Sequence, residues 1–570
     1  MNDVFKIISK KSDEHEFFTP IPLGYKIGKT KYIVIFGTVI SGLGKGILSS
    51  SLGLILQNKG LVVSPMKFDG YLNQDAGTLN PFRHGEVFVL DDGLECDMDL
   101  GTYERILHKN LSRDYYLTGG MVFNKIISNE RKGIYLGRDV QFIPHVTGEI
   151  KLFLRNLALK SNADIVFVEV GGTVGDIENL YFVEAMRQLF YEEGANNVCF
   201  IALTYIIKPV FLGEQKSKSA QLGIKNLLSL GIQPHIIGCR SDEPVSVKVR
   251  EKISMYSNVP FERVFSLHDV RSIYEVPFLL KKEGIDESVI KILDINKKKI
   301  NVRKEVKEIN RWKKYLNNYN NPKSEVSIGI VGKYTGIRDS YASILKALEH
   351  AGTFLKCKIN VKWVETTDLK RSEISKELKG LNGIIVPGGY GTRGVEGKIL
   401  CVEYARKNNL PYLGLCYGFQ MAVIEFARNV CGLRDANTTE VDSKTKYPVI
   451  DILPEQKDVE GLGGTNKLGG RNVLIKKGSK AYELYKKELI RERFRHRFEF
   501  NPDYLEVFEE KGMVFSGKDS DVQIMQILEL PKHPFFIGTQ FHPEFNSRPL
   551  VPHPLFTEFV KVAGLKNRKT

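Results

Sequence analysis

A cysteine flanked by glycines stands between an expected strand and an expected helix in the second half of the chain. The stretch is Gly414-Leu415-Cys416-Tyr417-Gly418, and the helical pattern runs over 419–428. Small residues on both sides of a nucleophile permit the sharp turn that exposes its side chain above a sheet. A thiol at a helix N-terminus is also favoured as the reactive thiolate. The pattern therefore predicts a cysteine nucleophile.

A histidine and a glutamate near the C-terminus are spaced to assist this cysteine. In His542-Pro543-Glu544 the proline biases the histidine toward an extended backbone, in which residues two apart point to one side. The pair can then act as a base and the group that orients it, which completes a Cys-His-Glu triad. Upstream, the turn 387–391 (PGGYG) offers backbone amides suited to an oxyanion. Singly, a buried structural cysteine or a surface histidine would explain each residue; together they favour acyl transfer.

A glycine-rich loop in the first half has the order of a phosphate site. The apolar run 32–36 ends at Gly37, and a small-residue turn leads into a helical pattern near Gly44. Glycines let the backbone approach phosphate oxygens, and Lys45 would add a positive charge. The loop departs from the common triphosphate motif, because Val39 stands at the first glycine and Gly46 replaces the magnesium-binding hydroxyl residue. A metal would need carboxylates elsewhere, and an ordinary glycine turn is the alternative.

Composition indicates a globular protein of several domains. The chain has 570 residues, of which 42% are hydrophobic and 26% charged. Its net charge of +15 is spread along the chain among 67 acidic residues, which favours nucleotides over nucleic acid as partners. Seven scattered cysteines and no apolar run of membrane length predict a cytoplasmic protein without disulfides, structural zinc or membrane contact. The first thirty residues resemble neither a signal nor a transit peptide.

Alternating apolar runs and helical patterns predict two α/β domains, each a doubly wound, mostly parallel sheet. We expect an N-terminal extension at 1–30, a first domain at 31–298, a charged helical linker at 299–323 and a second domain at 324–570. Strands are expected at 32–36, 61–66, 165–170, 198–203, 235–239, 326–331, 383–386, 412–415 and 536–541. Helices are expected around 45–59, 178–193 and 216–230. Ligands in such folds bind beyond the carboxyl ends of the strands.

These motifs together resemble a known family. The turn at 387–389, the cysteine turn and His542-Pro543-Glu544 are similar to class I glutamine amidotransferases, which hydrolyse glutamine and pass ammonia to a partner domain. The first half adds SGLGKG (41–46), HGEVFVLDDG (84–93), DMDLGTYER (97–105), VEVGGTVGDIE (168–178) and GEQKSKSAQ (213–221). Over residues 31–562 the chain therefore resembles the CTP synthase family. The resemblance implies an ATP-dependent amination of UTP to CTP, in a P-loop-like synthase domain, with ammonia released from glutamine.

The resemblance also implies the residues of each site. Its catalytic residues are Cys416, His542 and Glu544. Its ATP-binding residues are Gly42, Leu43, Gly44, Lys45, Gly46, Lys67, Asp99 and Val270. Its UTP- or CTP-binding residues are Ser41, Asp176, Ile177, Glu178, Lys216, Lys218, Gln221 and Lys252. Its glutamine-binding residues are Gly389, Tyr417, Gly418, Phe419, Gln420, Glu440 and Arg497. Its metal ligands are Asp99 and Glu169, with Asp69 as a further candidate.

The implied partners are Mg²⁺ with ATP, CTP as an inhibitor, and GTP as an allosteric activator near Arg393. His84 falls in the family's ammonia passage, and the implied assembly is a homotetramer that can form filaments. Three places depart from the family pattern: Thr38 replaces a glycine, Gly70 a proline, and Ser219-Ala220 a Pro-Thr pair. These changes bear on nucleotide affinity and feedback. The alternatives are a non-catalytic, filament-forming homologue with a weakened nucleotide site, and a glutaminase that serves another acceptor.

Overall fold

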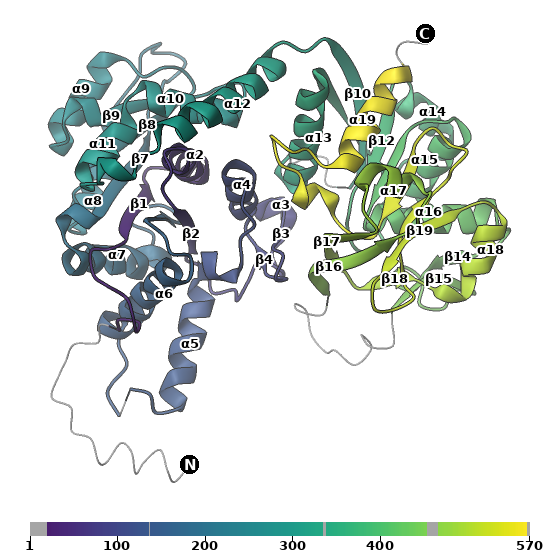
Figure 1. Ribbon diagram of the computed structural model, residues 1–570, viewed down its shortest axis with the longest axis horizontal. Coiled ribbons are helices and arrows are strands. Elements are labelled where there is room, and N and C mark those ends of the chain that lie inside the picture. The colour runs from purple at the N-terminus through teal and green to yellow at the C-terminus, as the bar shows by residue number, and fades with distance from the viewer. Residues whose placement is uncertain (1–19, 136, 334–337, 453–465, 567–570) are drawn as a thin grey trace. The chain divides into compact units, whose positions relative to one another are not determined.

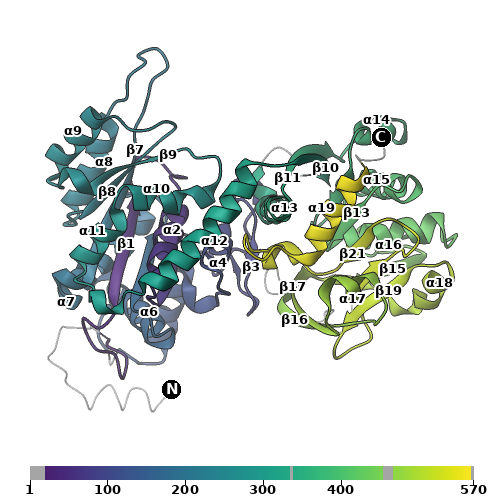
Figure 2. The same ribbon diagram turned by 45° about the horizontal axis from the view of Figure 1, so that its top comes forward.

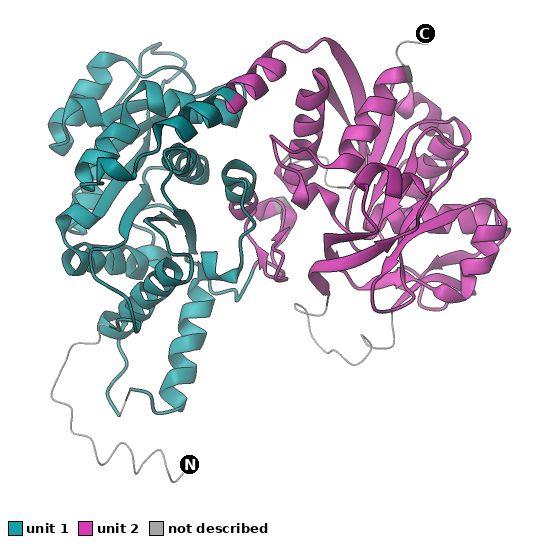
Figure 3. Ribbon diagram, viewed as in Figure 1, with its two compact units in different colours: residues 1–75, 102–310 teal, residues 76–101, 311–570 magenta. Residues whose placement is uncertain are grey.

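The computed structural model describes residues 20–135, 137–333, 338–452 and 466–566. The chain forms two compact units, coloured separately in Figure 3. The first unit comprises residues 1–75 and 102–310, and the second comprises residues 76–101 and 311–570. The second unit thus includes a segment from the first half of the chain, and we call residues 76–101 the inserted segment.

The first unit contains a seven-stranded sheet in which every neighbouring pair of strands is parallel. In spatial order the strands are β5 (Tyr116–Thr118), β2 (Val63–Asp69), β6 (Ile165–Val170), β1 (Lys31–Gly37), β7 (Val198–Tyr205), β8 (Ile236–Ser241) and β9 (Val264–His268). Strands β2 and β6 are buried along their whole length. Helices cover such a sheet on both faces, which explains the continuous apolar runs in the sequence.

Helices follow the strands of this sheet and flank it in Figure 1. They are α2 (Lys45–Asn58), α5 (Gly119–Arg131), α6 (Thr147–Lys160), α7 (Leu180–Glu193), α8 (Lys218–Ser229), α9 (Val247–Ser257), α10 (Val276–Lys282) and α11 (Ile285–Ile292). Helix α2 packs against α10 and α11, whereas α6 packs against α7. The predicted α/β class and the predicted helices at 45–59, 178–193 and 216–230 are confirmed to within two residues.

Part of the expected N-terminal extension packs on the first unit, while its residues 1–19 lie outside the described residues. The Gly28 amide donates to a carboxylate oxygen of Glu193 over 3.0 Å. The hydroxyl groups of Tyr25 and Tyr32 are 2.7 Å apart. Residues 20–30 are therefore attached to the start of β1, at the edge of the sheet opposite to the carboxyl ends of its strands.

The second unit contains a nine-stranded sheet that is parallel on one side and antiparallel on the other. Five parallel strands come first, namely β11 (Cys357–Glu365), β10 (Ser324–Gly332), β12 (Gly383–Val386), β13 (Tyr412–Leu415) and β21 (Phe536–Thr539). Four antiparallel strands continue the sheet, namely β20 (Met525–Glu529), β19 (Val514–Asp519), β16 (Lys467–Ile475) and β17 (Leu489–His496). The sequence pattern predicted β10, β12, β13 and β21, but neither β11 nor the four antiparallel strands.

Smaller elements complete the second unit. A three-stranded sheet contains β14 (Ala436–Thr438), β15 (Tyr447–Ile452) and β18 (Phe498–Phe500). A two-stranded sheet in the inserted segment contains β3 (Phe88–Val89) and β4 (Glu95–Cys96). The helices are α3 (Pro81–His84), α13 (Ala342–Leu355), α14 (Arg371–Leu378), α15 (Val395–Lys407), α16 (Tyr417–Asn429), α17 (Lys480–Tyr485), α18 (Leu505–Glu510) and α19 (Pro554–Lys566). Helices α4 (Met98–Leu107) and α12 (Val302–Asn320) each contain a unit boundary, and α12 lies in the expected linker.

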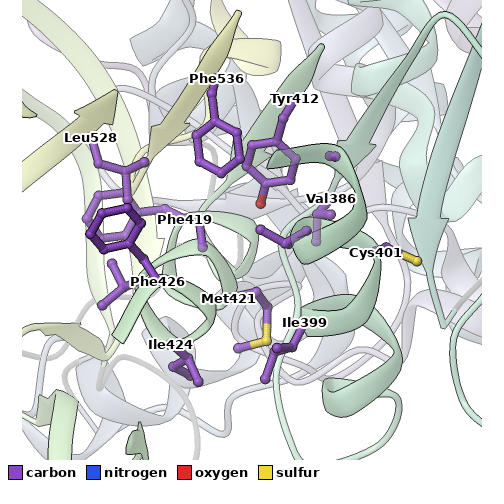
Figure 4. Close-up of a cluster of buried hydrophobic side chains, with 14 of the residues drawn as sticks. Val386, Ile399, Cys401, Tyr412, Phe419, Met421, Ile424, Phe426, Leu528 and Phe536 are labelled. Carbon is purple, nitrogen blue, oxygen red and sulfur yellow. The ribbon is translucent and has the colours of Figure 1, made fainter. Parts of the chain in front are cut away.

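A hydrophobic core supports the strand and helix that flank Cys416, as Figure 4 shows. The rings of Tyr412 on β13 and Phe536 on β21 stack with centroids 4.5 Å apart. The Tyr412 hydroxyl donates to the carbonyl of Gly418 over 2.8 Å and so joins β13 to the first turn of α16. Helix α16 is buried from Tyr417 to Ala427. The cysteine therefore stands on a rigid support.

The glycine after the cysteine turn generates a stability prediction. A Cβ at Gly418 would lie 2.1 Å from the carbonyl oxygen of Val386, which is a fixed backbone atom of β12. We expect Gly418→Ala to lower the free energy of unfolding of the second unit by roughly 1–3 kcal/mol, because α16 must move away from the sheet. Urea denaturation followed by tryptophan fluorescence measures the shift.

The matched control is Gly389→Ala, because a Cβ at Gly389 would meet no heavy atom within 4 Å. Equal urea midpoints for the two variants would contradict the close packing of α16 against β12.

Candidate active sites

Cys416 occupies a strained turn between β13 and α16. Its backbone has φ +50° and ψ −96°, in the region that non-glycine residues rarely adopt. The Cys416 amide donates to the carbonyl of Thr539 over 2.7 Å, which holds the turn against β21. A Cβ at Gly414 would lie 2.6 Å from the Tyr412 hydroxyl oxygen, so both flanking glycines are required by close packing. The observed turn has the geometry of a nucleophile elbow.

His542 and Glu544 form a buried pair next to the cysteine. The Nδ1 atom of His542 lies 2.7 Å from Oε1 of Glu544. Burial alone would lower the pKa of His542, but the charges of Glu544 and Cys416 outweigh it and raise the pKa to about 10. The imidazole stacks on the ring of Phe545 with centroids 5.0 Å apart. This environment favours the protonated imidazole of His542.

The glycine turn after β12 lies against both groups. A Cβ at Gly388 would be 2.7 Å from Cε1 of His542 and 3.6 Å from Cβ of Cys416, so only glycine lets the turn come this close. Gly389 lines the pocket, and a Cβ at this position would meet no heavy atom within 4 Å. The turn thus has the position required of an oxyanion site for an acyl group on Cys416.

A pocket of about 740 Å³ opens over Cys416, and all the residues that line it belong to the second unit. Gly389, Glu440 and Arg497, three of the expected glutamine contacts, line it together with Cys416 and His542. Tyr417, Gly418, Phe419 and Gln420 form the first turn of α16 behind the cysteine instead. The inserted segment lines part of the pocket through residues 77–79, Pro81, Glu86, Val87 and Glu95.

The polar groups of this pocket suit an amino acid. The Nε atom of Arg497 is buried and has no hydrogen-bond partner among the described residues, so it is available to a carboxylate. Glu440 accepts a hydrogen bond from the Gly391 amide over 2.6 Å. Burial raises the pKa of the Glu440 carboxyl above its ordinary value, and this amide opposes the shift. The carboxylate of an amino acid could therefore pair with Arg497, and its ammonium group with Glu440.

The second expected site lies at the carboxyl ends of the strands of the first unit. Between β1 and α2 the backbone is left-handed at Val39 (φ +76°), Gly42 (φ +72°) and Gly44 (φ +83°). Val39 thus adopts the conformation for which the common motif uses its first glycine. Lys45 is buried, and its Nζ donates to the carbonyl of Gly172 over 2.7 Å. The loop after β6 therefore holds this lysine at the glycine loop.

Buried charges stand at the ends of β2 and β6. Nζ of Lys67 lies 3.0 Å from Glu169 and 3.5 Å from Asp69. The Tyr103 hydroxyl donates to the other oxygen of Glu169. Asp69 and Glu169 offer the carboxylate oxygens that Mg²⁺ prefers, and their role as metal ligands stays a prediction. Among the described residues no group of three or more His, Cys, Asp or Glu side chains is arranged to hold a metal.

Asp99 lies in the first turn of α4, within the inserted segment, and its amide donates to Asp97 over 2.8 Å. Its role as a metal ligand beside Glu169 stays a prediction.

Most of the expected nucleotide residues of the first unit lie on loops and helix starts after the strands of its sheet. Ser41 is in the β1–α2 loop, residues 176–178 precede α7, and Val270 follows β9. Lys216, Lys218 and Gln221 lie at the start of α8, and Lys252 lies on α9. Lys216 pairs with Glu214, and Gln221 donates to Ser217 over 3.1 Å. The ligands of all these residues stay predictions.

Two of the departures from the family pattern have local steric partners. The side chain of Thr38 packs against α8, where a Cβ at Gly223 would lie 2.7 Å from Cβ of Thr38. At Gly70 a Cβ would lie 2.3 Å from Oδ1 of Asn179, so the glycine makes room for that asparagine. Both substitutions are therefore accommodated by their neighbours.

Several residues of the sites were missed by the sequence analysis. Arg495 pairs with Glu95 of the inserted segment over 2.6 Å, and its carbonyl lies 3.5 Å from the Cys416 sulfur. Phe88 packs against Phe545, the residue that stacks on His542, and the ring centroids of Phe88 and Phe545 are 4.9 Å apart. Gln540 also contacts the cysteine. No local pattern marks these contacts, because each joins residues far apart in the chain.

All seven cysteines are free thiols. Among the helices that the structure describes, none combines the length and the apolar character needed to cross a bilayer.

Comparison with known proteins identifies both regions. Residues 31–295 match the family described as CTP synthase N-terminus, and residues 337–562 match glutamine amidotransferase class-I. The CTP synthase of Pyrococcus abyssi is 51% identical over 535 residues, which cover 94% of this chain and 98% of that protein. The CTP synthase of Caldanaerobacter subterraneus subsp. tengcongensis is 49% identical over 531 residues, which cover 93% and 98%.

A further comparison is with a solved structure. The glutaminase domain of Trypanosoma brucei CTPS with bound acivicin is 36% identical, covers 42% of this chain and 93% of that chain, and has a TM-score of 0.40. The two regions, matched in order and nearly end to end by proteins of about half identical sequence, show that the chain belongs to the CTP synthase family of glutamine-hydrolysing C–N ligases.

Proposed function

We propose that this chain converts UTP to CTP with ATP and with ammonia that its second unit releases from glutamine. The observation that carries the proposal is the meeting of Cys416, His542 and the 388–389 glycine turn in one pocket, in a chain of this family. The phosphate-type loop with buried Lys45 supports the nucleotide half of the reaction.

The second unit hydrolyses glutamine through a thioester. The Cys416 thiolate attacks the side-chain carbonyl carbon, a C–S bond forms, and the oxyanion is stabilised by amides of the glycine turn. His542 then gives its proton to the amide nitrogen, the C–N bond breaks, and ammonia leaves. A water deprotonated by His542 attacks the thioester, which releases glutamate and restores the thiolate. Glu544 holds the imidazole in position.

The first unit activates the pyrimidine. Transfer of the ATP γ-phosphoryl group to the C4 oxygen of UTP makes that oxygen a leaving group, and ammonia then displaces phosphate at C4. Lys45 and Lys67 are proposed to bind the phosphates, and Ser41, the 176–178 loop and the lysines near α8 to bind UTP. Glu169 and Asp69, with Asp99, would hold Mg²⁺, which when bound neutralises phosphate charge.

The remaining expectations are part of the proposal. The pocket over Cys416 reaches the residues that flank His84, which supports a start of the ammonia passage there. GTP activation near Arg393, inhibition by CTP, a homotetramer with filaments, and a cytoplasmic location follow from the family resemblance. The free cysteines agree with a reducing compartment.

Removal of the thiol tests the separation of the two reactions. We expect Cys416→Ala to lower glutamine-dependent CTP formation by roughly a thousandfold or more, while formation from ammonium chloride stays within about twofold. The coupled assay follows CTP by absorbance with each nitrogen source. Cys431→Ala, at a half-buried cysteine just beyond the C-terminal end of α16, is the control and should leave both rates unchanged. Loss of both rates in Cys416→Ala, with the fold intact, would speak against two separate sites.

The opposite pattern is expected at the glycine loop. Lys45→Ala should lower ammonia-dependent CTP formation by about a hundredfold, because a buried phosphate-binding cation is lost, while alkylation of Cys416 is unaffected. Lys160→Ala, at an exposed lysine paired with Asp114, is the control.

Full ammonia-dependent activity in Lys45→Ala would contradict the proposal that this loop binds a nucleotide. Melting temperatures with ATP and UTP separate the alternatives, since a non-catalytic homologue with a weakened site gains no stability from them. A glutaminase serving another acceptor shows ATP hydrolysis that does not respond to UTP.

The His542–Glu544 pair predicts a pH dependence. His542 is protonated below its raised pKa of about 10, so glutamine hydrolysis should persist through neutral pH and fall as pH rises toward 10. Glu544→Gln removes a charge that raises this pKa, so the alkaline limb of kcat/KM should move to lower pH by roughly one unit or more. Initial rates from pH 6 to 10.5 measure the limb. An unmoved limb in Glu544→Gln would show that another group controls it.

A further inference from the structure

The side chain of Gln540 contacts the reacting sulfur. Nε2 of Gln540 lies 3.7 Å from Sγ of Cys416, within the range of a hydrogen bond to sulfur. Gln540 directly follows β21, and its neighbour Thr539 accepts the hydrogen bond of the Cys416 amide. Gln540 and His542, which both follow the end of β21, interact with the Cys416 side chain.

Neighbouring hydrogen bonds fix the orientation of the Gln540 amide. Nε2 of Gln420 donates to the carbonyl of Phe498 over 2.8 Å and lies 3.4 Å from Oε1 of Gln540. Because the oxygen of Gln540 faces a donor, its NH₂ group must face the sulfur. Gln540 is fully buried and Gln420 is 2% exposed, so water does not compete for these groups.

The sulfur of Cys416 has two neutral neighbours, the Arg495 carbonyl and the Gln540 amide, and they interact differently with a thiol and with a thiolate. The carbonyl of Arg495, 3.5 Å away, can accept from a thiol but repels a thiolate. The side-chain N–H group of Gln540, in contrast, is a donor. Its contact with the sulfur therefore strengthens when the sulfur is charged. Among the described residues, Gln540 is therefore the uncharged side-chain donor to the thiolate, beside the imidazolium of His542.

We propose that Gln540 is a further functional residue of the glutaminase site, whose side-chain amide stabilises the Cys416 thiolate and aims it into the pocket. The proposal deepens the proposed function and rests on Cys416 as its nucleophile. The hydrogen bond is present before attack and weakens as the sulfur loses its charge to the new C–S bond. Gln540 consequently sets how much reactive thiolate faces the substrate, and it does not bind glutamine itself.

Two substitutions at Gln540 test this role. Gln540→Met keeps the length of the side chain and removes the N–H donor, and Gln540→Glu keeps its shape but faces the thiolate with a carboxylate. We expect the rate of Cys416 alkylation by iodoacetamide at pH 7.5, mapped by mass spectrometry, to fall at least tenfold in both. The kcat of glutamine hydrolysis should fall by a similar factor, while KM changes by less than about threefold.

Gln526→Met is the matched control. Gln526 is also a fully buried glutamine, it lies on the adjacent strand β20, and its carbonyl accepts the Gln540 amide over 2.9 Å. Its side-chain amide has no hydrogen-bond partner among the described residues. Alkylation and kcat should stay within about twofold in this variant, and urea midpoints show whether each variant is folded.

The outcomes decide the proposal. Alkylation within twofold of wild type in folded Gln540→Met or Gln540→Glu would overturn it. An equal loss in Gln526→Met would also overturn it, because the effect would then be a general one on the core. If the unsubstituted protein alkylates at Cys416 but hydrolyses no glutamine, the proposed function fails while the alkylation rates still decide the role of Gln540.

Discussion

The charge interaction between the Cys416 sulfur and the His542 imidazole is the feature that the second unit must maintain. Both groups are buried, and burial opposes a charge on either one alone. Glu544 and the sulfur together hold the proton on His542, as the raised pKa of this histidine indicates. A small displacement of either group would weaken this interaction. The surroundings of the pair are accordingly rigid.

Support for the pair comes from distant parts of the chain. Strand β21 holds the Cys416 amide, α16 packs without space against β12, and Phe545 stacks on the imidazole. The inserted segment contributes Phe88 against Phe545 and Glu95 against Arg495. Residues from the first half of the sequence therefore line and brace the glutaminase pocket. In the first unit the parallel sheet plays the same part, because the ends of β1, β2 and β6 bring Lys45, Lys67 and Glu169 to one edge.

The sequence predicted those parts of this arrangement that local patterns encode. Strands β6, β12 and β13 lie at the expected residues, and the cysteine turn has the expected strain at position 416. The antiparallel strands β16, β17, β19 and β20 were not predicted, and β16 in particular contains Gly469 and Gly470 and does not alternate clearly. The pairing of Arg495 with Glu95 joins residues 400 positions apart, so no periodicity could indicate it. Gln540 was missed for the same reason, because its partners Cys416 and Gln420 lie more than a hundred positions away, in the turn after β13 and on α16.

Transfer of nitrogen within one protein is the central claim, and an isotope label tests it most directly. The protein would be incubated with UTP, ATP, Mg²⁺ and glutamine that carries ¹⁵N only in its side-chain amide. Excess unlabelled ammonium would be present, and a low pH would limit the concentration of free ammonia. Nitrogen NMR and mass spectrometry of the product nucleotide then locate the label. The account predicts CTP labelled in its exocyclic amino group, in step with the glutamate formed. Labelled ammonium accumulating beside unchanged UTP would contradict it.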